Sequence, residues 1–195
     1  GLFLSVLSIK DKARPNDGSA SPTMSFWRVG RGLNPPAWTS SMRSRAGIKD
    51  CRYPHWLVLE VGADKPGDIS SLAAWLCPDV SVITRFAEVP VHIEFFPSVS
   101  ALIQEKSALV HFTREKGLLV LGSDDAEVAA LQSAARGKKV VRFGTTNDAE
   151  VRGSHYAVRI GADRFPEGII FRADSGGMSL PLSVSGALGA LSKVA

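Results

Sequence analysis

The stretch between residues 56 and 144 constrains the fold most, because short apolar runs alternate there with segments of helical periodicity. The apolar runs cover residues 56–62, 80–84, 118–121 and 139–143. The segments between them place apolar residues three and four positions apart, which predicts helices at 68–76, 99–112 and 125–135, the first capped by Asp68. Strands that alternate with helices at this spacing form a parallel sheet. The sequence therefore predicts an α/β fold in which helices flank a mostly parallel sheet.

After residue 148 the pattern changes to strands without helices between them. Three runs of strand-forming residues, at 156–160, 168–172 and 180–184, are separated by turns such as Asp174-Ser175-Gly176-Gly177. Strands joined by short, glycine-rich turns pair in the antiparallel sense. We therefore expect an α/β core over residues 53–150, a small antiparallel β extension over 151–186, and the start of a further helix at 187–195.

Polar side chains follow three of the predicted strands. Glu60 lies near the end of the first strand, His92 lies in the loop after the second, and Asp124 and Asp125 lie just past the end of the third. The carboxyl ends of parallel strands meet at one edge of a sheet, where ligands bind in open α/β folds. We therefore expect a ligand site at this edge. An equally strong alternative for the two aspartates is that they cap the following helix.

Lys106 lies on the core-facing side of its predicted helix. At about 100° per residue, it falls within the apolar stripe of that helix rather than opposite it. The stripe consists of Val99, Leu102, Ile103, Leu109 and Val110. One interpretation is that the ammonium group reaches past its neighbours to water. The other is that it points into the cleft where Glu60 and His92 also end.

Three sequence motifs, taken in order, resemble the ATP-dependent Mur ligases of peptidoglycan synthesis, most closely the members that add D-alanyl-D-alanine. The first, WLVLEVGADKPGDI, carries Glu60 before a Pro-Gly-Asp turn. In the second, VITRFAEVPVHIEFFPSVSALIQEKSALV, His92 precedes Lys106 by 14 residues, and the third, GLLVLGSDD, ends in the aspartate pair. The resemblance covers residues 53–186 and implies a sheet like that of the P-loop NTPases.

The resemblance implies ATP and Mg²⁺ as cofactors. It assigns Glu60 to a Mg²⁺ at the ATP phosphates and His92 to a second Mg²⁺. It makes Lys106 a candidate for carbamylation and metal binding, and places Asp124 and Asp125 on the nucleotide side. Glu94 would bind a metal-bound water or orient His92. The implied substrates are a UDP-muramoyl peptide and an amino acid or D-Ala-D-Ala, joined by a cytoplasmic, monomeric enzyme. The alternative enzymes are a ligase related to folylpolyglutamate synthase and a Mur ligase of a different step.

Residues 1–52 differ in character from the rest of the chain. They hold nine Lys or Arg against three Asp, and residues 11–50 lack helical or strand periodicity. We expect an irregular basic segment, with residues 1–8 as the remnant of a helix and residues 20–50 translated out of frame. For the function of the chain, the alternatives to a ligase are a basic binding protein or a non-catalytic remnant. Binding of nucleic acid by the basic segment is a weaker expectation. The family's G-x-G-K-T/S phosphate loop is absent from the sequence, so we expect an incomplete chain that is inactive alone.

Some positions depart from the family pattern. Arg85 and Gly122 stand where most members have asparagine, the second at a position associated with adenine, and Gly186-Ala187-Leu188-Gly189 replaces G-x-H-N. The nucleotide contacts therefore depart from the family pattern, whereas Glu60, His92 and Lys106 agree with it. The composition, with 45% hydrophobic and 22% charged residues, is that of a globular domain, and no apolar run reaches the length of a membrane span.

Overall fold

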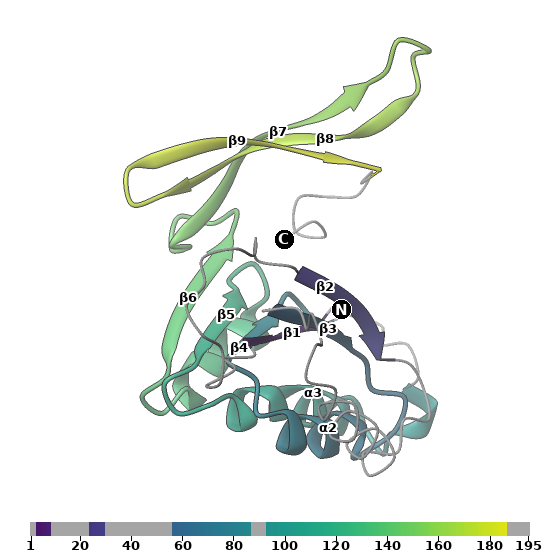
Figure 1. The fold of residues 1–195 in the computed structure, drawn as a ribbon, viewed down its shortest axis with the longest axis vertical. Helices are drawn as coiled ribbons and strands as arrows, with labels where there is room; N and C mark the ends of the chain where they lie inside the picture. Colours follow the sequence, from purple (N-terminus) through teal and green to yellow (C-terminus); the bar gives the residue numbers. More distant parts are fainter. Residues whose placement is uncertain (1–2, 9–23, 30–55, 87–92, 187–195) are drawn as a thin grey trace, which may run out of the picture.

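A computed structural model describes residues 3–8, 24–29, 56–86 and 93–186 of the chain. One nine-stranded sheet runs through it, in the order β2-β3-β1-β4-β5-β6-β7-β8-β9 (Figure 1). The strands are β1 (Phe3–Ser8), β2 (Met24–Val29), β3 (Trp56–Val61), β4 (Val80–Ile83), β5 (Leu118–Gly122), β6 (Lys139–Gly144), β7 (Val151–Ile160), β8 (Pro166–Ser175) and β9 (Met178–Ser185). The helices are α2 (Asp68–Leu76), α3 (Val99–Phe112) and α4 (Ala126–Ala130), with short 3₁₀ turns η1 (Ile93–Phe95) and η2 (Leu131–Ala134).

The sheet is parallel through its centre and antiparallel at its C-terminal end, as predicted. Strands β4, β5 and β6 pair in parallel, and the first residues of β7 continue this pairing with β6. Strands β7, β8 and β9 then pair in the antiparallel sense. Strand β3 runs in the same direction as β4, because β1 lies antiparallel between them. The carboxyl ends of β3, β4, β5 and β6 therefore lie at the same edge.

Two expectations for the N-terminal segment are wrong. The helical remnant expected at residues 1–8 is strand β1, and the stretch that lacked visible periodicity contains strand β2, which pairs in parallel with β3. A run of six residues is the usual length of a strand and too short for a stable helix. In β1, hydrogen bonds to β3 on one side and β4 on the other satisfy the backbone groups. The rest of residues 11–50, and the helix expected at 187–195, lie outside the described residues.

Helices α2 and α3 pack side by side against one face of the sheet (Figure 1). Leu59, Ile83 and Leu119, on three different strands, have no exposed surface. Ile69 of α2 and Leu109 of α3 meet them from the helical layer and are equally buried. Each such side chain contributes roughly 1.5–3 kcal/mol of hydrophobic stabilisation. The core therefore fixes how the two helices lie on the sheet. Within the described ranges, no helix has the length and hydropathy needed to cross a membrane.

The ends of the helices differ from the sequence prediction in two places. Gly67 is the N-cap of α2, and the carboxylate of Asp68 accepts hydrogen bonds from Asp64 N and Lys65 N, in the preceding turn. Asp68 is therefore the first helical residue and does not cap the helix. The helix predicted at 125–135 divides into α4 and η2. The Ser133 hydroxyl donates to Ala130 O at 2.8 Å, a competing hydrogen bond that favours the tighter turn.

The antiparallel extension carries polar groups on one of its faces. There the Asp174 carboxylate accepts hydrogen bonds from the hydroxyls of Ser154, at 2.6 Å, and Ser179. These two hydrogen bonds hold the pKa of Asp174 below its usual value. Arg172 also donates to Ser179, at 2.8 Å. Phe171 alternates with these residues along β8 and so belongs to the opposite face, which is directed toward the core of the sheet.

Candidate functional site

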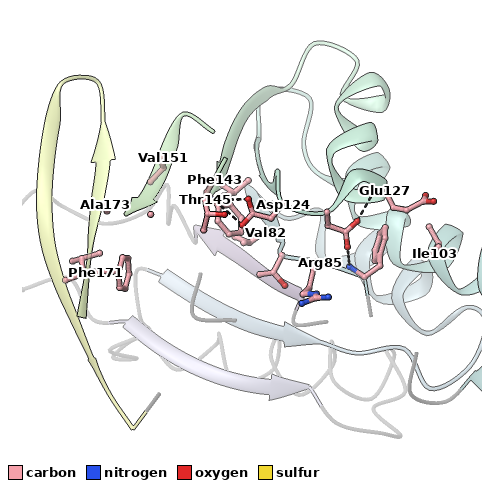
Figure 2. A pocket seen from close by; sticks show the side chains of 18 of the residues that line it. Val82, Arg85, Ile103, Asp124, Glu127, Phe143, Thr145, Val151, Phe171 and Ala173 are labelled. Carbon is pink, nitrogen blue, oxygen red and sulfur yellow. Dashed lines mark hydrogen bonds between the residues drawn. The ribbon is translucent and has the colours of Figure 1, made fainter. Parts of the chain in front are cut away.

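A cavity of about 720 Å³ lies between the carboxyl ends of β4, β5 and β6 and the apolar face of the antiparallel extension (Figure 2). Its volume falls within the range of sites that bind small molecules, roughly 300–1,000 Å³. The walls are mostly apolar, with Phe86, Val99, Ile103, Phe143, Phe171 and Leu182 among the lining residues. The charged lining residues are Arg85, Asp124, Asp125 and Glu127. The cavity therefore combines an apolar body with a few charged groups at the sheet edge where the sequence predicted a ligand site.

Asp125 holds two sides of the cavity together. Its Oδ2 accepts a hydrogen bond from Phe86 N, in the segment after β4, at 2.7 Å. Its Oδ1 accepts from Glu127 N and Val128 N at 3.0 and 3.1 Å and thereby caps α4. The alternative that this aspartate caps the following helix is confirmed. A cap does not exclude contact with a ligand, because Asp125 also lines the cavity.

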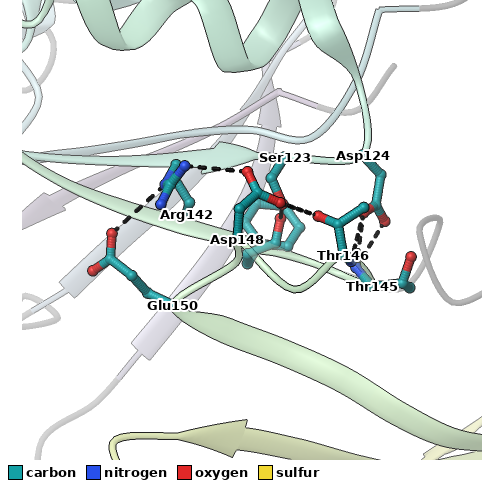
Figure 3. A network of polar contacts seen from close by, with 8 residues as sticks. Ser123, Asp124, Arg142, Thr145, Thr146, Asp148 and Glu150 are labelled. Atoms are coloured by element: carbon teal, nitrogen blue, oxygen red, sulfur yellow. Dashed lines mark hydrogen bonds and ion pairs between the residues drawn. The ribbon is translucent and has the colours of Figure 1, made fainter.

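Asp124 binds the loop after β6 and does not cap α4 (Figure 3). Both of its carboxylate oxygens accept from Thr145 N, at 2.8 and 3.0 Å, and Oδ1 also accepts from Thr146 N at 3.3 Å. The Thr146 hydroxyl donates to Asp148, and this hydrogen bond lowers the pKa of the Asp148 carboxyl group. Arg142 donates to the same carboxylate at 3.1 Å. Asp124 therefore anchors a polar network at the rim of the cavity.

Arg85 is a cation in the wall of a mostly apolar cavity. It follows strand β4 by two residues, and its side chain is drawn within the lining in Figure 2. Its exposure is intermediate. No hydrogen bond or ion pair of Arg85 occurs among the residues that the structure describes. An anionic group of a ligand would find a guanidinium donor here, whereas Asp124 and Asp125 already accept backbone hydrogen bonds.

Gly122 allows two strands to approach each other closely. A Cβ atom built on this residue would lie 2.0 Å from Thr84 O, a backbone atom of the neighbouring segment. A contact this short requires the backbone to move. The asparagine that the resemblance implies at this position therefore does not fit this arrangement. Here backbone packing, and not a side-chain amide, forms that part of the cavity wall.

Glu60 and Lys106 belong to the same half of the molecule, while His92 lies outside the described residues. Glu60 is the residue before the last in β3, at the carboxyl edge of the sheet, and is half-buried. Lys106 lies on α3 and is only 8% exposed, which confirms its position on the core-facing stripe. Burial lowers the pKa of its ammonium group. Neither residue lines the cavity, and their joining with His92 in one cleft stays a prediction.

Several residues around the site differ from their predicted roles or were not predicted. Val99, assigned to the apolar stripe of α3, is 46% exposed and lines the cavity. Glu94 lies exposed in η1.

Thr145 and Thr146 were not predicted as site residues. They follow β6 much as Asp124 follows β5, so polar residues after a strand end were the available sequence signal. The wall formed by Phe171 and Leu182 had no such signal, because it depends on how the extension folds back over the core.

Comparison with known proteins gives three results. Residues 46–187 match the family model of the Mur ligase middle domain. The UDP-N-acetylmuramoyl-tripeptide--D-alanyl-D-alanine ligase of Mycobacterium leprae is 31% identical over 87 residues, which are 45% of this chain and 16% of that protein. The enzyme of the same name from Mycobacterium tuberculosis is 29% identical over 104 residues, 53% of this chain and 20% of that protein. The chain thus spans about a fifth or less of the length of these curated relatives.

Solved structures share the fold. MurF ligase from Thermotoga maritima, solved in complex with ADP, aligns with a TM-score of 0.56 and 21% identity, over 83% of this chain and 34% of that chain. MurF from Acinetobacter baumannii aligns with a TM-score of 0.56 and 18% identity, over 67% of this chain and 27% of that chain. At these identities the likeness concerns the fold alone.

Proposed function

Because this chain belongs to the Mur ligase family through a middle domain that spans residues 46–187, we propose that it is the nucleotide-binding part of a cytoplasmic, ATP-dependent ligase. The ligase would form the amide bond between a UDP-muramoyl tripeptide and D-Ala-D-Ala. The curated relatives carry that activity in their names, which favours it over a folylpolyglutamate synthase.

The cavity at the carboxyl edge of the parallel strands is the observation that carries this proposal. Its apolar walls suit the base and sugar of a nucleotide, and Arg85 offers a cation to an anionic group. MurF ligase from Thermotoga maritima, part of which shares this fold, was solved in complex with ADP. We assign the cavity to ATP, with Asp124 and Asp125 in its wall.

The proposed reaction has two steps. A carboxylate oxygen of the tripeptide attacks the γ-phosphorus of ATP, the bond to the β–γ bridging oxygen breaks, and ADP leaves. The amine of D-Ala-D-Ala then attacks the acyl carbon, the amine loses a proton, and inorganic phosphate leaves as the amide forms. Catalysis of such phosphoryl transfer depends mainly on positioning and on electrostatic stabilisation.

The residues present suit a magnesium ion only if Lys106 is modified. No group of three or more His, Cys, Asp or Glu side chains is arranged to hold a metal in the described part of the chain. An ammonium group has no lone pair for a metal, whereas a carbamate offers carboxylate-like oxygens, which Mg²⁺ prefers. We propose that Glu60 would hold one magnesium ion and His92 a second, with carbamylated Lys106 as a further oxygen ligand. When bound, Mg²⁺ neutralises charge on the phosphates.

Burial favours the carbamylation of Lys106. The reaction needs the neutral amine, which adds to CO₂ and releases one proton, and the lowered pKa of Lys106 increases the neutral fraction. With ¹³C-bicarbonate and Mg²⁺, we expect a carbamate resonance in the ¹³C NMR spectrum of the chain. The resonance should be lost in Lys106→Met.

Lys116→Met is the matched control, because Lys116 is exposed and lies in the turn before β5. This variant should keep the resonance. The proposed metal site would be wrong if the chain without substitutions gave no carbamate signal, or if Lys106→Met left the signal unchanged.

A further inference from the structure

We propose that Glu105 is a positioning residue that clamps α3 to the first turn of α2 and thereby fixes where Lys106 lies. This inference rests on the proposed function, in which Lys106 is carbamylated and binds metal. Glu105 directly precedes Lys106 on α3, yet its side chain serves another helix. Its role was not predicted from the sequence.

The clamp consists of hydrogen bonds from α2 to one carboxylate. Glu105 Oε1 accepts from the backbone N–H groups of Ile69 and Ser70, both at 2.8 Å. The Ser70 hydroxyl lies within hydrogen-bond distance of both oxygens, at 3.1 and 3.2 Å. These bonds are partly buried and join residues more than thirty positions apart in the sequence. Hydrogen bonds to a charged acceptor are stronger than neutral ones.

Helix α2 depends on this carboxylate because its own cap is missing. The N-cap residue, Gly67, has no side chain to accept a hydrogen bond. The side chain of Asp68 accepts from Asp64 N and Lys65 N instead. The first N–H groups of a helix have no partner within it. Glu105 supplies the acceptor from α3, and its negative charge is also favourable at the positive end of the α2 dipole.

The clamp restricts the position of α3 in two ways. It fixes the rotation of α3 about its axis, because neighbouring residues on a helix point about 100° apart. With Glu105 directed to α2, Lys106 is directed toward the core, where it is 8% exposed. It also links two predicted metal-site residues, since α2 begins soon after β3, which carries Glu60. A continuous path therefore runs from Glu60 through the loop and the first turn of α2 to Glu105 and Lys106.

Four variants test whether Glu105 positions Lys106 or only caps helix α2. Glu105→Ala removes the acceptor, Glu105→Asp keeps the charge but shortens the side chain, and Glu105→Gln keeps the shape and one acceptor oxygen. Ser98→Ala is the matched control, because it removes the cap of α3 itself, where Ser98 Oγ accepts from Ala101 N at 3.1 Å. Each variant is studied in the full chain by three measurements. These are amide exchange at Ile69 and Ser70, the acetylation rate of Lys106 by mass spectrometry, and the ¹³C carbamate signal.

We expect Glu105→Ala and Glu105→Asp to speed acetylation of Lys106 and amide exchange at Ile69 by about tenfold, through local opening, and to weaken the carbamate signal. Glu105→Gln keeps an acceptor oxygen but loses the charge, so it should speed acetylation and amide exchange less than Glu105→Ala does. Ser98→Ala should leave Lys106 protected. The proposal is overturned if acetylation is unchanged in Glu105→Asp, or if Ser98→Ala raises it equally. If Glu105→Ala fails to fold, Glu105→Asp decides. The Glu105 variants could speed acetylation and amide exchange although the chain without substitutions gives no carbamate signal. That result would refute the proposed carbamylation of Lys106 but support the role of Glu105 in positioning α3.

Discussion

Gly122→Ala should destabilise the chain by about 3 kcal/mol, at the upper end of what overpacking a core costs. The added Cβ would lie 2.0 Å from Thr84 O and 3.0 Å from the carbonyl carbon of Thr84. A side chain can rotate away from such a contact, but a backbone atom next to paired strands cannot. Strands β4 and β5 would have to separate at Ile83 and Leu121, which are paired. Urea denaturation, followed by circular dichroism, measures the loss.

Gly62→Ala is the matched control for this prediction. A Cβ atom at Gly62 meets nothing within 4 Å. This substitution should leave the free energy of unfolding within about 1 kcal/mol of the original value, and a small gain is expected from the less flexible unfolded chain. Equal urea midpoints for Gly122→Ala and Gly62→Ala would show that the strands do not approach as described. Gly122→Asn should be at least as destabilising as Gly122→Ala, because the amide adds further bulk.

Asp125→Ala should also cost about 3 kcal/mol, for a different reason. Loss of the α4 cap accounts for about 1 kcal/mol of this. Loss of the charge-assisted hydrogen bond from Phe86 N, which is 2.7 Å long, adds about 2 kcal/mol. The alanine variant leaves the N–H groups of Phe86, Glu127 and Val128 without this acceptor. Thermal or urea unfolding of the variant measures the effect.

Two further variants test this explanation. Asp125→Asn retains one acceptor oxygen for the cap, so its loss of stability should be about half that of the alanine variant. Asp163→Ala removes an aspartate that accepts a single bond from Phe165 N, at 3.1 Å, in an exposed turn. It should change the free energy of unfolding by less than about 1 kcal/mol. Asp125→Ala with no more effect than Asp163→Ala would contradict the bridging role of Asp125.

The sequence predicted the features that depend on local periodicity. The runs that became β4 and β5 are apolar because one face packs against the helices, while Val82 and Val120 on the other face line the cavity. The stripe of α3 placed Lys106 correctly, since residues 102, 106 and 109 share one side of a helix and all three are buried. The charged cavity residues Asp124 and Asp125 could also be found, because they lie just past the end of a strand.

Features that depend on long-range contacts were not predicted. Strand β1 lies between β3 and β4 because two neighbours satisfy its backbone, and no local pattern contains that information. The apolar wall at Phe171 and Leu182 exists only because the antiparallel extension faces the core. Asp68 has the residue type of a cap but turns toward Asp64, while Glu105, thirty-six residues from Ile69, takes over that role.

The central claim is that the cavity at the carboxyl edge of β4, β5 and β6 binds the nucleotide of a Mur ligase. A ¹H–¹⁵N NMR titration with Mg·ADP tests it most directly, using Ala173→Phe to fill the cavity and Ala157→Phe, on the exposed side of β7, as the matched control. We expect shifts at the amides of Gly122, Asp124 and Thr145. Ala173→Phe should weaken binding by about tenfold, which corresponds to about 1.4 kcal/mol, while Ala157→Phe leaves it unchanged. Shifts confined to other residues, or equal affinities of the two folded variants, would contradict the assignment.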